Sequence, residues 1–375
     1  MTKKKRAFLI TICILCTIFL AIFGGYVGIF VGRRSRLNTI DFSVLNGSAN
    51  KVVLFIGDGM GENHIKVTSS YYEKQMFMTT FDYKGKMSTF SNAVFFPTDS
   101  AAAASAMATG QKYNNKEVSR HNNVDIKSIS EYAKQKGYGV GIVTTDNLYG
   151  ATPAGFSSHA DKRGNTEQII LGQLENNFDL YLGAGKTTYE NYKDLLKNKG
   201  YNYQNDISLL EITNEKIFGV FSSIVASGGN NTTPTLEMLT SFAVDYFETN
   251  FPNGYFLMIE GAHIDKKSHS NQIFEMMDYL NSFDESIKVC YGKLAMQDNV
   301  SIIVTADHET GGLKFNNQTR EQIDNSLYTR LGHSAKDVPY FIYYKTSKDI
   351  DFGSIIKKRI DNTDIFKLCK SLIGD

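Results

Sequence analysis

The chain has 375 residues, of which 40 are Lys or Arg and 39 are Asp or Glu, so its formal net charge is +1. Seven of the basic residues lie in positions 1–36, before the first acidic residue, Asp41, and the remainder therefore carries a net charge of −6. A mildly acidic body argues against a nucleic-acid-binding surface, so we expect no nucleic-acid partner. The sequence shows no internal repeat and no second linker, which favours one large domain from residue 51 to residue 375.

Residues 7–32 form an uncharged run that is long enough to span the ~30 Å hydrocarbon core of a bilayer. We expect residues 1–36 to form an uncleaved N-terminal anchor, a transmembrane helix followed by a polar linker over 37–50. Basic residues flank both ends of the run, and their slight N-terminal excess favours a cytoplasmic N-terminus with the main domain outside. The small residues at 21–25 leave open the alternative of a cleaved signal segment and a secreted protein.

From residue 51 onward, apolar runs alternate with helical patterns. This alternation predicts an α/β fold, with a mostly parallel central sheet and helices on both faces. The expected strands are 51–57, 138–144, 179–182, 217–221, 255–259, 300–305 and 338–344. The expected helices are 62–74, 100–109, 125–136, 166–176, 189–197, 234–248, 271–294 and 361–372.

The segment 97–110 predicts an alanine-rich helix with Asp99 as its N-cap and Gly110 as its stop. Ser100 then lies in the first turn, where unpaired N–H groups and the helix dipole favour an anion. A serine hydroxyl at such a place suits a nucleophile that attacks phosphate. An ordinary helix cap explains most Asp-Ser pairs, so the interpretation depends on whether metal ligands lie nearby.

Polar residues follow four of the predicted strands. Asp58 follows the strand at 51–57, Thr152 lies in the loop after 138–144, Glu260 follows 255–259, and the pair 307–308 follows 300–305. Because ligands bind at the carboxyl ends of such strands, these side chains are expected at one edge of the sheet. A turn or cap explains any one of them, but not the agreement of all four.

Two further features suit zinc. Asp265 and His269 are four residues apart and can share one face of a helical turn, and Asp307 with His308 forms a second carboxylate–imidazole pair. His333, which precedes the strand at 338–344, would supply the ligand that a three-ligand zinc site still lacks.

Taken together, these segments resemble those of alkaline phosphatases, in family order. The resemblance rests on residues 57–61, 98–102, 151–154, 260–269, 305–312 and 332–339. It implies an alkaline phosphatase-like fold and a metal-dependent hydrolase that acts on phosphate monoesters through a phosphoserine intermediate. It also allows a homodimer.

The resemblance implies a role for each matched residue. Ser100 is the nucleophile, and Arg163 clamps the phosphate. The first zinc is held by Asp265, His269 and His333, the second zinc by Asp58, Asp307 and His308, and a magnesium by Asp58, Thr152 and Glu260.

Two departures from the family pattern stand out. Position 150 holds Gly where the family has Asp or His, which predicts a weakened magnesium site. Only about 25 residues separate His308 from His333, which leaves little room for the family's surface insert.

Two other activities stay open, a phosphodiesterase or sulfatase of the same superfamily and a membrane-tethered phosphate-binding protein without turnover. The sulfatase signature is absent at Ser100, where alanines follow, and Arg163 favours monoesters. Cys290 and Cys369 lie in predicted helices far apart in the sequence, and although they could pair, we expect two buried free thiols.

Overall fold

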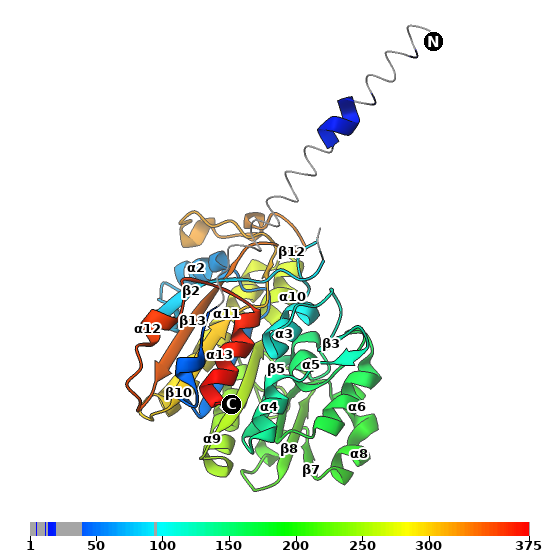
Figure 1. Ribbon diagram of the computed structural model, residues 1–375, viewed down its shortest axis with the longest axis vertical. Coiled ribbons are helices and arrows are strands. Elements are labelled where there is room, and N and C mark those ends of the chain that lie inside the picture. The colour runs from blue at the N-terminus through cyan, green and yellow to red at the C-terminus, as the bar shows by residue number, and fades with distance from the viewer. Residues whose placement is uncertain (1–4, 6–11, 13, 20–39, 94–95, 375) are drawn as a thin grey trace. The chain divides into compact units, whose positions relative to one another are not determined.

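The computed structural model describes residues 5, 12, 14–19, 40–93 and 96–374 (Figure 1). The chain divides into two compact units, residues 1–40 and 41–375. The predicted membrane segment at 7–32 lies largely outside the described residues, so membrane attachment stays a prediction, as does the homodimer. Among the residues that are described, no helix combines the length and the apolar character needed to cross a bilayer.

The second unit alternates strands and helices along most of its length. Its strands are β1 (Lys51–Gly57), β2 (Tyr83–Ser88), β3 (Arg120–His121), β4 (Val124–Asp125), β5 (Gly139–Asn147), β6 (Leu180–Ala184), β7 (Tyr201–Gln204), β8 (Lys216–Phe221), β9 (Tyr255–Gly261), β10 (Val300–Thr305), β11 (Glu309–Thr310), β12 (His333–Ser334), β13 (Val338–Lys345) and β14 (Arg359–Asp361). Its α-helices are α2 (Glu62–Tyr71), α3 (Ser100–Thr109), α4 (Ile129–Gln135), α5 (Ala151–Ser157), α6 (Thr166–Asn176), α7 (Lys186–Tyr189), α8 (Lys193–Asn198), α9 (Leu236–Asn250), α10 (His263–His269), α11 (Ile273–Leu294), α12 (Phe352–Ile355) and α13 (Thr363–Ile373). Short 3₁₀ turns are η1 (Ser43–Leu45), η2 (Phe77–Thr80), η3 (Glu190–Tyr192), η4 (Ile207–Leu209), η5 (Arg320–Gln322) and η6 (Asn325–Leu327).

The described residues form a ten-stranded sheet in the order β14-β2-β13-β10-β1-β9-β5-β6-β8-β7. Within it, β13 runs against its neighbours β10 and β2, and the other neighbouring strands are parallel. Every residue of β1, β9 and β10 is buried, as expected for parallel strands that are covered on both faces. The predicted fold class is therefore confirmed.

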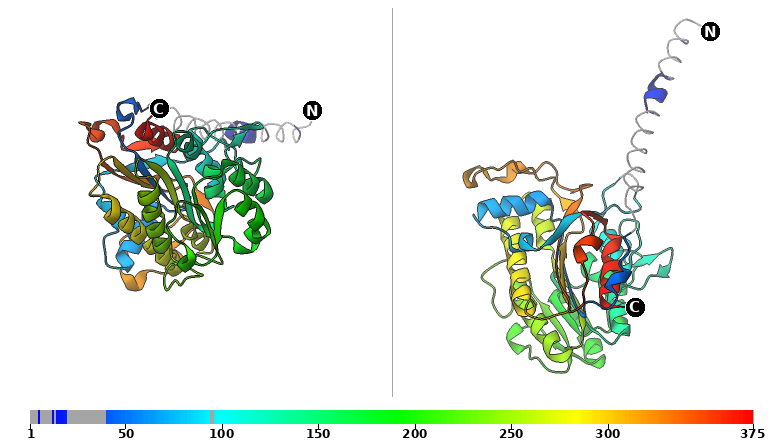
Figure 2. Two further views of the ribbon diagram at one scale, coloured as in Figure 1. Left: turned by 90° about the horizontal axis from the view of Figure 1, so that it is seen from below. Right: turned by 60° about the vertical axis from the view of Figure 1, so that its left-hand side comes forward.

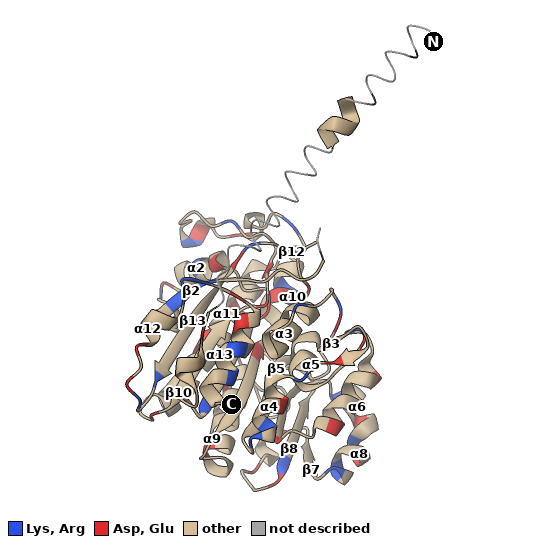
Figure 3. Ribbon diagram, viewed as in Figure 1, with Lys and Arg blue, Asp and Glu red and all other residues tan. Residues whose placement is uncertain are grey.

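Two groups of helices cover the sheet. Helices α3, α4, α5 and α13 pack together, and α2, α9, α10 and α11 form the second group. In the right-hand view of Figure 2, the sheet runs between α11 and α13, so the two groups lie on opposite faces. Acidic and basic residues are interspersed over these elements in the view of Figure 3.

Several predicted boundaries need correction. The predicted linker at 37–50 is too long, because residues from Asp41 onward belong to the second unit, where Gly47 N–H donates to the Ser371 carbonyl at 2.9 Å. The sequence pattern missed β2 and β7, whose residues are partly exposed, and β14, which is only three residues long. The prediction for the cysteines is confirmed, since Cys290 and Cys369 are buried and free.

Candidate metal centre and nucleophile

The polar residues expected at the strand ends do lie at one edge of the sheet. Strands β10, β1, β9 and β5 are neighbours and parallel, so their carboxyl ends point the same way. Asp58 follows β1, Glu260 is the last residue but one of β9, and Asp307 lies just after β10. Thr152 is in the first turn of α5 rather than in a loop, and its side chain is buried.

Ser100 begins α3, as the sequence predicts. Asp99 caps the helix, with its Oδ1 accepting the Ala102 N–H at 3.0 Å, and Gly110 ends it with φ +75°. All residues of α3 are buried, and their small side chains allow the helix to pack closely on α5 and α13. The Ser100 hydroxyl lies 3.2 Å from Nε2 of His308, which brings the helix start to the group of candidate ligands.

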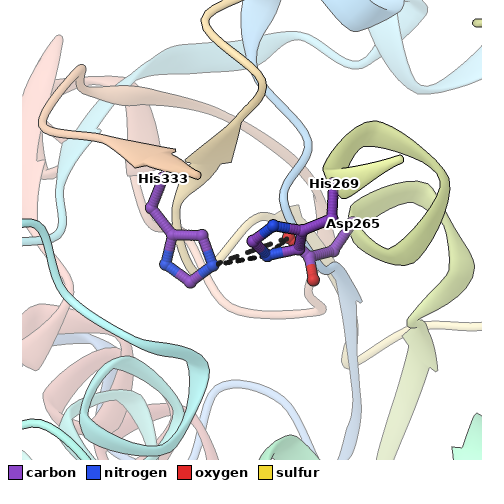
Figure 4. Close-up of side chains that lie close together, drawn as sticks. All are labelled: Asp265, His269 and His333. Carbon is purple, nitrogen blue, oxygen red and sulfur yellow. Dashed lines mark hydrogen bonds and ion pairs between the residues drawn. The ribbon is translucent and has the colours of Figure 1, made fainter. Parts of the chain in front are cut away.

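The first predicted zinc set comes together (Figure 4). Asp265 and His269 lie on α10, and His333 reaches them from β12. Asp265 Oδ1 is 3.4 Å from Nε2 of His269 and 3.7 Å from Nε2 of His333, and the two Nε2 atoms are 3.1 Å apart. One ligand atom from each of the three residues therefore faces a common point.

The contacts of Nδ1 in His269 and His333 show which ring nitrogen carries a proton. Nδ1 of His269 lies 2.5 Å from the Leu331 carbonyl, and Nδ1 of His333 lies 2.7 Å from the Thr98 carbonyl. A carbonyl only accepts, so each Nδ1 carries a proton, and in the neutral tautomer that can bind a metal each ring presents an Nε2 lone pair. Two lone pairs that face each other at 3.1 Å repel, unless a cation lies between them. The donor set therefore fits a metal ion.

The second predicted zinc set also comes together. Nε2 of His308 is 3.4 Å from Asp58 Oδ1 and 3.3 Å from Asp307 Oδ2. Both carboxylate oxygens are buried and accept no hydrogen bond from any described residue, whereas Asp307 Oδ1 accepts the N–H groups of Gly59 and His308. Buried oxygens without partners are costly in a metal-free protein, so they too fit a cation at this point. Asp58, Asp265 and His308 form a further compact group, which places Asp265 between the two sets.

The residues predicted to hold magnesium lie beside this set. Glu260 is buried and accepts a hydrogen bond from the Thr144 hydroxyl, which faces it across β5 and β9. The Thr152 hydroxyl is 1 % exposed and has no hydrogen-bond partner among the described residues. Oxygen donors of this kind suit magnesium.

The charges of the centre are mutually repulsive without a metal. Burial, and then the charges of Asp307, Asp265 and Glu260, raise the pKa of Asp58 well above its usual range. Burial, and then the charge of Asp146, raise the pKa of Glu260 to about 8. Burial, and then His333, hold the pKa of His308 well below its usual range. Bound cations would favour both the ionised carboxylates and the neutral imidazoles.

The side chain of Arg163 lies beside Asp99, the N-cap residue of α3. Its guanidinium Nη1 is 3.3 Å from Asp99 Oδ2, and its side chain is 41 % exposed. The side chain is therefore held beside Asp99, the residue before Ser100, and stays open to solvent.

A small two-stranded sheet explains how His333 reaches the centre from far along the chain. β11 and β12 pair antiparallel, with Thr310 opposite His333 and Glu309 opposite Ser334. Because β11 follows directly after Asp307 and His308, the pairing brings His333 to the same edge of the sheet. The imidazole rings of His308 and His333 stack with centroids 3.5 Å apart.

Sequence reasoning misplaced one histidine. The helix predicted over 62–74 favours a surface position for His64, but the structure buries it fully. Its Nδ1 accepts the Gly61 N–H at 3.2 Å, and its Nε2 lies 3.1 Å from the Ser268 hydroxyl. It thereby joins α2 to the helix that carries Asp265 and His269. Its place three residues after Gly61, at the third position of a helix, was the available signal, because a side chain there can reach back to the cap.

Thr310 was not predicted as a site residue, although it lies within a matched segment. Its hydroxyl donates to Asp265 Oδ1 at 2.5 Å and lies 3.2 Å from Nδ1 of His308. Thr310 therefore links the two ligand sets and orients the His308 ring with Nε2 toward Ser100.

Comparison with known proteins agrees with this arrangement. Residues 49–367 match the profile of the alkaline phosphatase family. The chain belongs to this family. It is 32 % identical to alkaline phosphatase 4 of Bacillus subtilis (strain 168), over 79 % of this chain and 68 % of that protein, and 30 % identical to alkaline phosphatase 3 of the same organism, over 83 % and 71 %.

A solved structure of the alkaline phosphatase family gives the same fold. It is a variant of TAB5 alkaline phosphatase, from an Antarctic bacterium, in which a histidine is replaced by Glu and magnesium is bound in the M3 site. The TM-score is 0.73 and the identity 27 %, over 88 % of this chain and 99 % of that chain. Membership of the alkaline phosphatase family supports phosphomonoester hydrolysis.

Proposed function

We propose that this protein hydrolyses phosphate monoesters at a centre of two zinc ions, through a phosphoserine formed on Ser100. The observation that carries the proposal is the 3.2 Å separation of the Ser100 hydroxyl from Nε2 of His308, at the edge where both three-residue ligand sets converge. This edge combines a serine at a helix start, buried carboxylates and neutral imidazoles, which are the parts that a metal-assisted phosphoryl transfer needs.

The residues present fit the metals. Asp265, His269 and His333 would hold the first zinc, and Asp58, Asp307 and His308 the second. Zinc bound at these places would lower the pKa of a coordinated hydroxyl and neutralise charge on the phosphoryl group. Asp58, Thr152 and Glu260 would hold magnesium, in line with the magnesium bound in the TAB5 structure.

The chain's own groups perform the transfer. The Ser100 hydroxyl releases its proton to solvent, and its oxygen then attacks phosphorus. The new O–P bond forms as the bond from phosphorus to the leaving alcohol oxygen breaks, and that oxygen takes a proton from water. A water molecule then attacks the phosphoserine, the Ser100 O–P bond breaks, and the serine oxygen regains a proton while inorganic phosphate leaves.

Arg163 orients the phosphoryl group. Its planar guanidinium can donate two hydrogen bonds to terminal phosphate oxygens, and Asp99 fixes its position at the helix start. A monoester has three terminal oxygens, so two stay free for this fork beyond the one that faces the metals, whereas a diester leaves only one. The arrangement therefore favours monoesters.

Turnover on matched chromogenic substrates tests the substrate class. We expect zinc- and magnesium-loaded protein to release the chromophore from a phosphate monoester far faster than from the corresponding diester or sulfate ester. Faster diester or sulfate release would assign another superfamily activity, and binding without release would assign the phosphate-binding alternative. Arg163→Lys, which keeps the charge but loses the fork, should reduce kcat/KM on the monoester by about tenfold or more.

A further inference from the structure

Gly150 lies two residues before Thr152, at the place where the family pattern has Asp or His. Its φ of −60° and ψ of 165° are open to any residue, so the backbone does not require glycine here. What restricts this position is space. A Cβ at residue 150 would lie 2.6 Å from Oδ2 of Asp146, closer than such atoms approach in proteins.

Asp146 therefore occupies the space next to position 150, and the fold holds it at the edge of the metal centre. It lies near the end of β5, and its backbone N–H donates to the Thr144 hydroxyl at 2.8 Å. The same hydroxyl donates to Glu260, so the two acidic residues share one hydrogen-bonded bridge. Burial is the largest cause of the raised pKa of Glu260, and the negative charge of Asp146 is the next.

The two oxygens of Asp146 have different surroundings. Oδ1 accepts the Asn147 N–H at 2.7 Å and forms an ion pair with Lys266, the residue after Asp265 on α10. Among the described residues, the hydrogen bonds to this carboxylate all go to Oδ1, which leaves Oδ2 on the side of residue 150. The ion pair with Lys266 offsets part of the negative charge of the centre.

An independent observation points to a ligand at this place. Thr152, the second residue of α5, is 1 % exposed, and its buried hydroxyl has no hydrogen-bond partner among the described residues. A buried hydroxyl without a partner fits a cation or a water bound to one.

We propose that Asp146 supplies the carboxylate that position 150 lacks, and so completes the magnesium site with Asp58, Thr152 and Glu260. The inference rests on the proposed function, of which that site is a part. It replaces the expectation of a weakened site, which considered residue 150 alone. The sequence carries the same acidic group, four residues earlier and on the strand instead of the helix.

Magnesium titration calorimetry of the zinc-loaded full chain tests this proposal. Asp146→Asn keeps the shape of the side chain and removes its charge, and we expect magnesium binding to weaken by about tenfold or more. Lys266→Met is the matched control, because it removes the same ion pair but leaves the carboxylate, and it should bind magnesium at least as tightly as the wild type. Equal weakening in both variants would show that Asp146 serves only the ion pair, and wild-type affinity in Asp146→Asn would also overturn the proposal.

Moving the carboxylate provides a second test. In Asp146→Ala/Gly150→Asp, the clash with Asp146 is gone, and the remaining close contact is the Asn147 backbone carbonyl, 2.9 Å from the Cβ position, so the turn before α5 must move to admit the new side chain. We expect this double variant to bind magnesium more tightly than Asp146→Ala alone, and equal binding would contradict the proposal. Phosphate monoester turnover by the wild type, measured on the same preparations, separates a failure of this inference from a failure of the proposed function. Turnover with unchanged magnesium binding in Asp146→Asn removes this inference alone, whereas no turnover by the wild type removes the proposed function.

Discussion

At the scale of single residues, the centre concentrates buried carboxyl groups whose ionised forms bound cations would favour. Glu260 shows this most directly, because its pKa is raised to about 8 by burial and then by Asp146. The ordinary pKa of a glutamate in an unfolded chain is about 4.3. The folded, metal-free protein therefore binds a proton that the unfolded chain does not, throughout the range between these two values.

The contribution of Glu260 to the free energy of unfolding of the metal-free protein should consequently fall as the pH rises through this range. We expect the Tm of chelator-treated wild type, taken relative to that of chelator-treated Glu260→Gln, to drop by several degrees from about pH 5 to about pH 8. The same difference should change less in metal-loaded protein, because metal binding favours the ionised form. Differential scanning calorimetry measures both differences, and an equal pH slope of Tm in metal-free wild type and Glu260→Gln would mean that another group carries the effect.

At the scale of elements, the centre depends on how short segments are joined to rigid ones. Strands β1, β9 and β10 fix Asp58, Glu260 and Asp307, and these positions could be predicted because buried parallel strands have a clear apolar pattern. The pairing of β11 with β12 could not be predicted in this way, because two-residue strands have no periodicity. His333 was found through its resemblance to the family, and its pairing with Thr310 explains the contact.

In the proposed first zinc set, His333 is the one residue that does not come from α10. His333→Ala should therefore reduce zinc from about two ions per chain to about one after dialysis, because a site with two protein ligands binds zinc much more weakly. Metal analysis by mass spectrometry measures this. His263→Ala is the matched control, since His263 lies on the same helix as His269 but contacts the Thr145 hydroxyl at 3.1 Å and stacks on Tyr279. Two zinc ions retained in His333→Ala would show that His333 is not a ligand.

At the scale of the whole molecule, the α/β alternation was sufficient to predict the sheet and the strand edge that carries the site. Three features needed the structure, and each depends on tertiary contacts. His64 is buried because α2 packs on the segment that carries Ser268, and residues 41–50 join the folded unit because they bond to α13 and its end. Asp146 takes the space beside Gly150 because β5 continues past Thr144, and no local pattern in the sequence indicates that proximity.

The central claim is that Ser100 carries the phosphoryl group, and acid trapping of labelled phosphate tests it most directly. Loaded protein is mixed with labelled inorganic phosphate or a labelled monoester, quenched in acid and digested, and the labelled peptide is sequenced. Ser105→Ala is the matched control, because Ser105 lies on the same helix, and its hydroxyl accepts the Ser119 N–H at 2.8 Å instead of facing the ligand sets. We predict label on Ser100 in the wild type and in Ser105→Ala, and none in Ser100→Ala, which should retain about two zinc ions and lose orders of magnitude in turnover. Label retained by Ser100→Ala, or found on another residue of the wild type, would contradict the account.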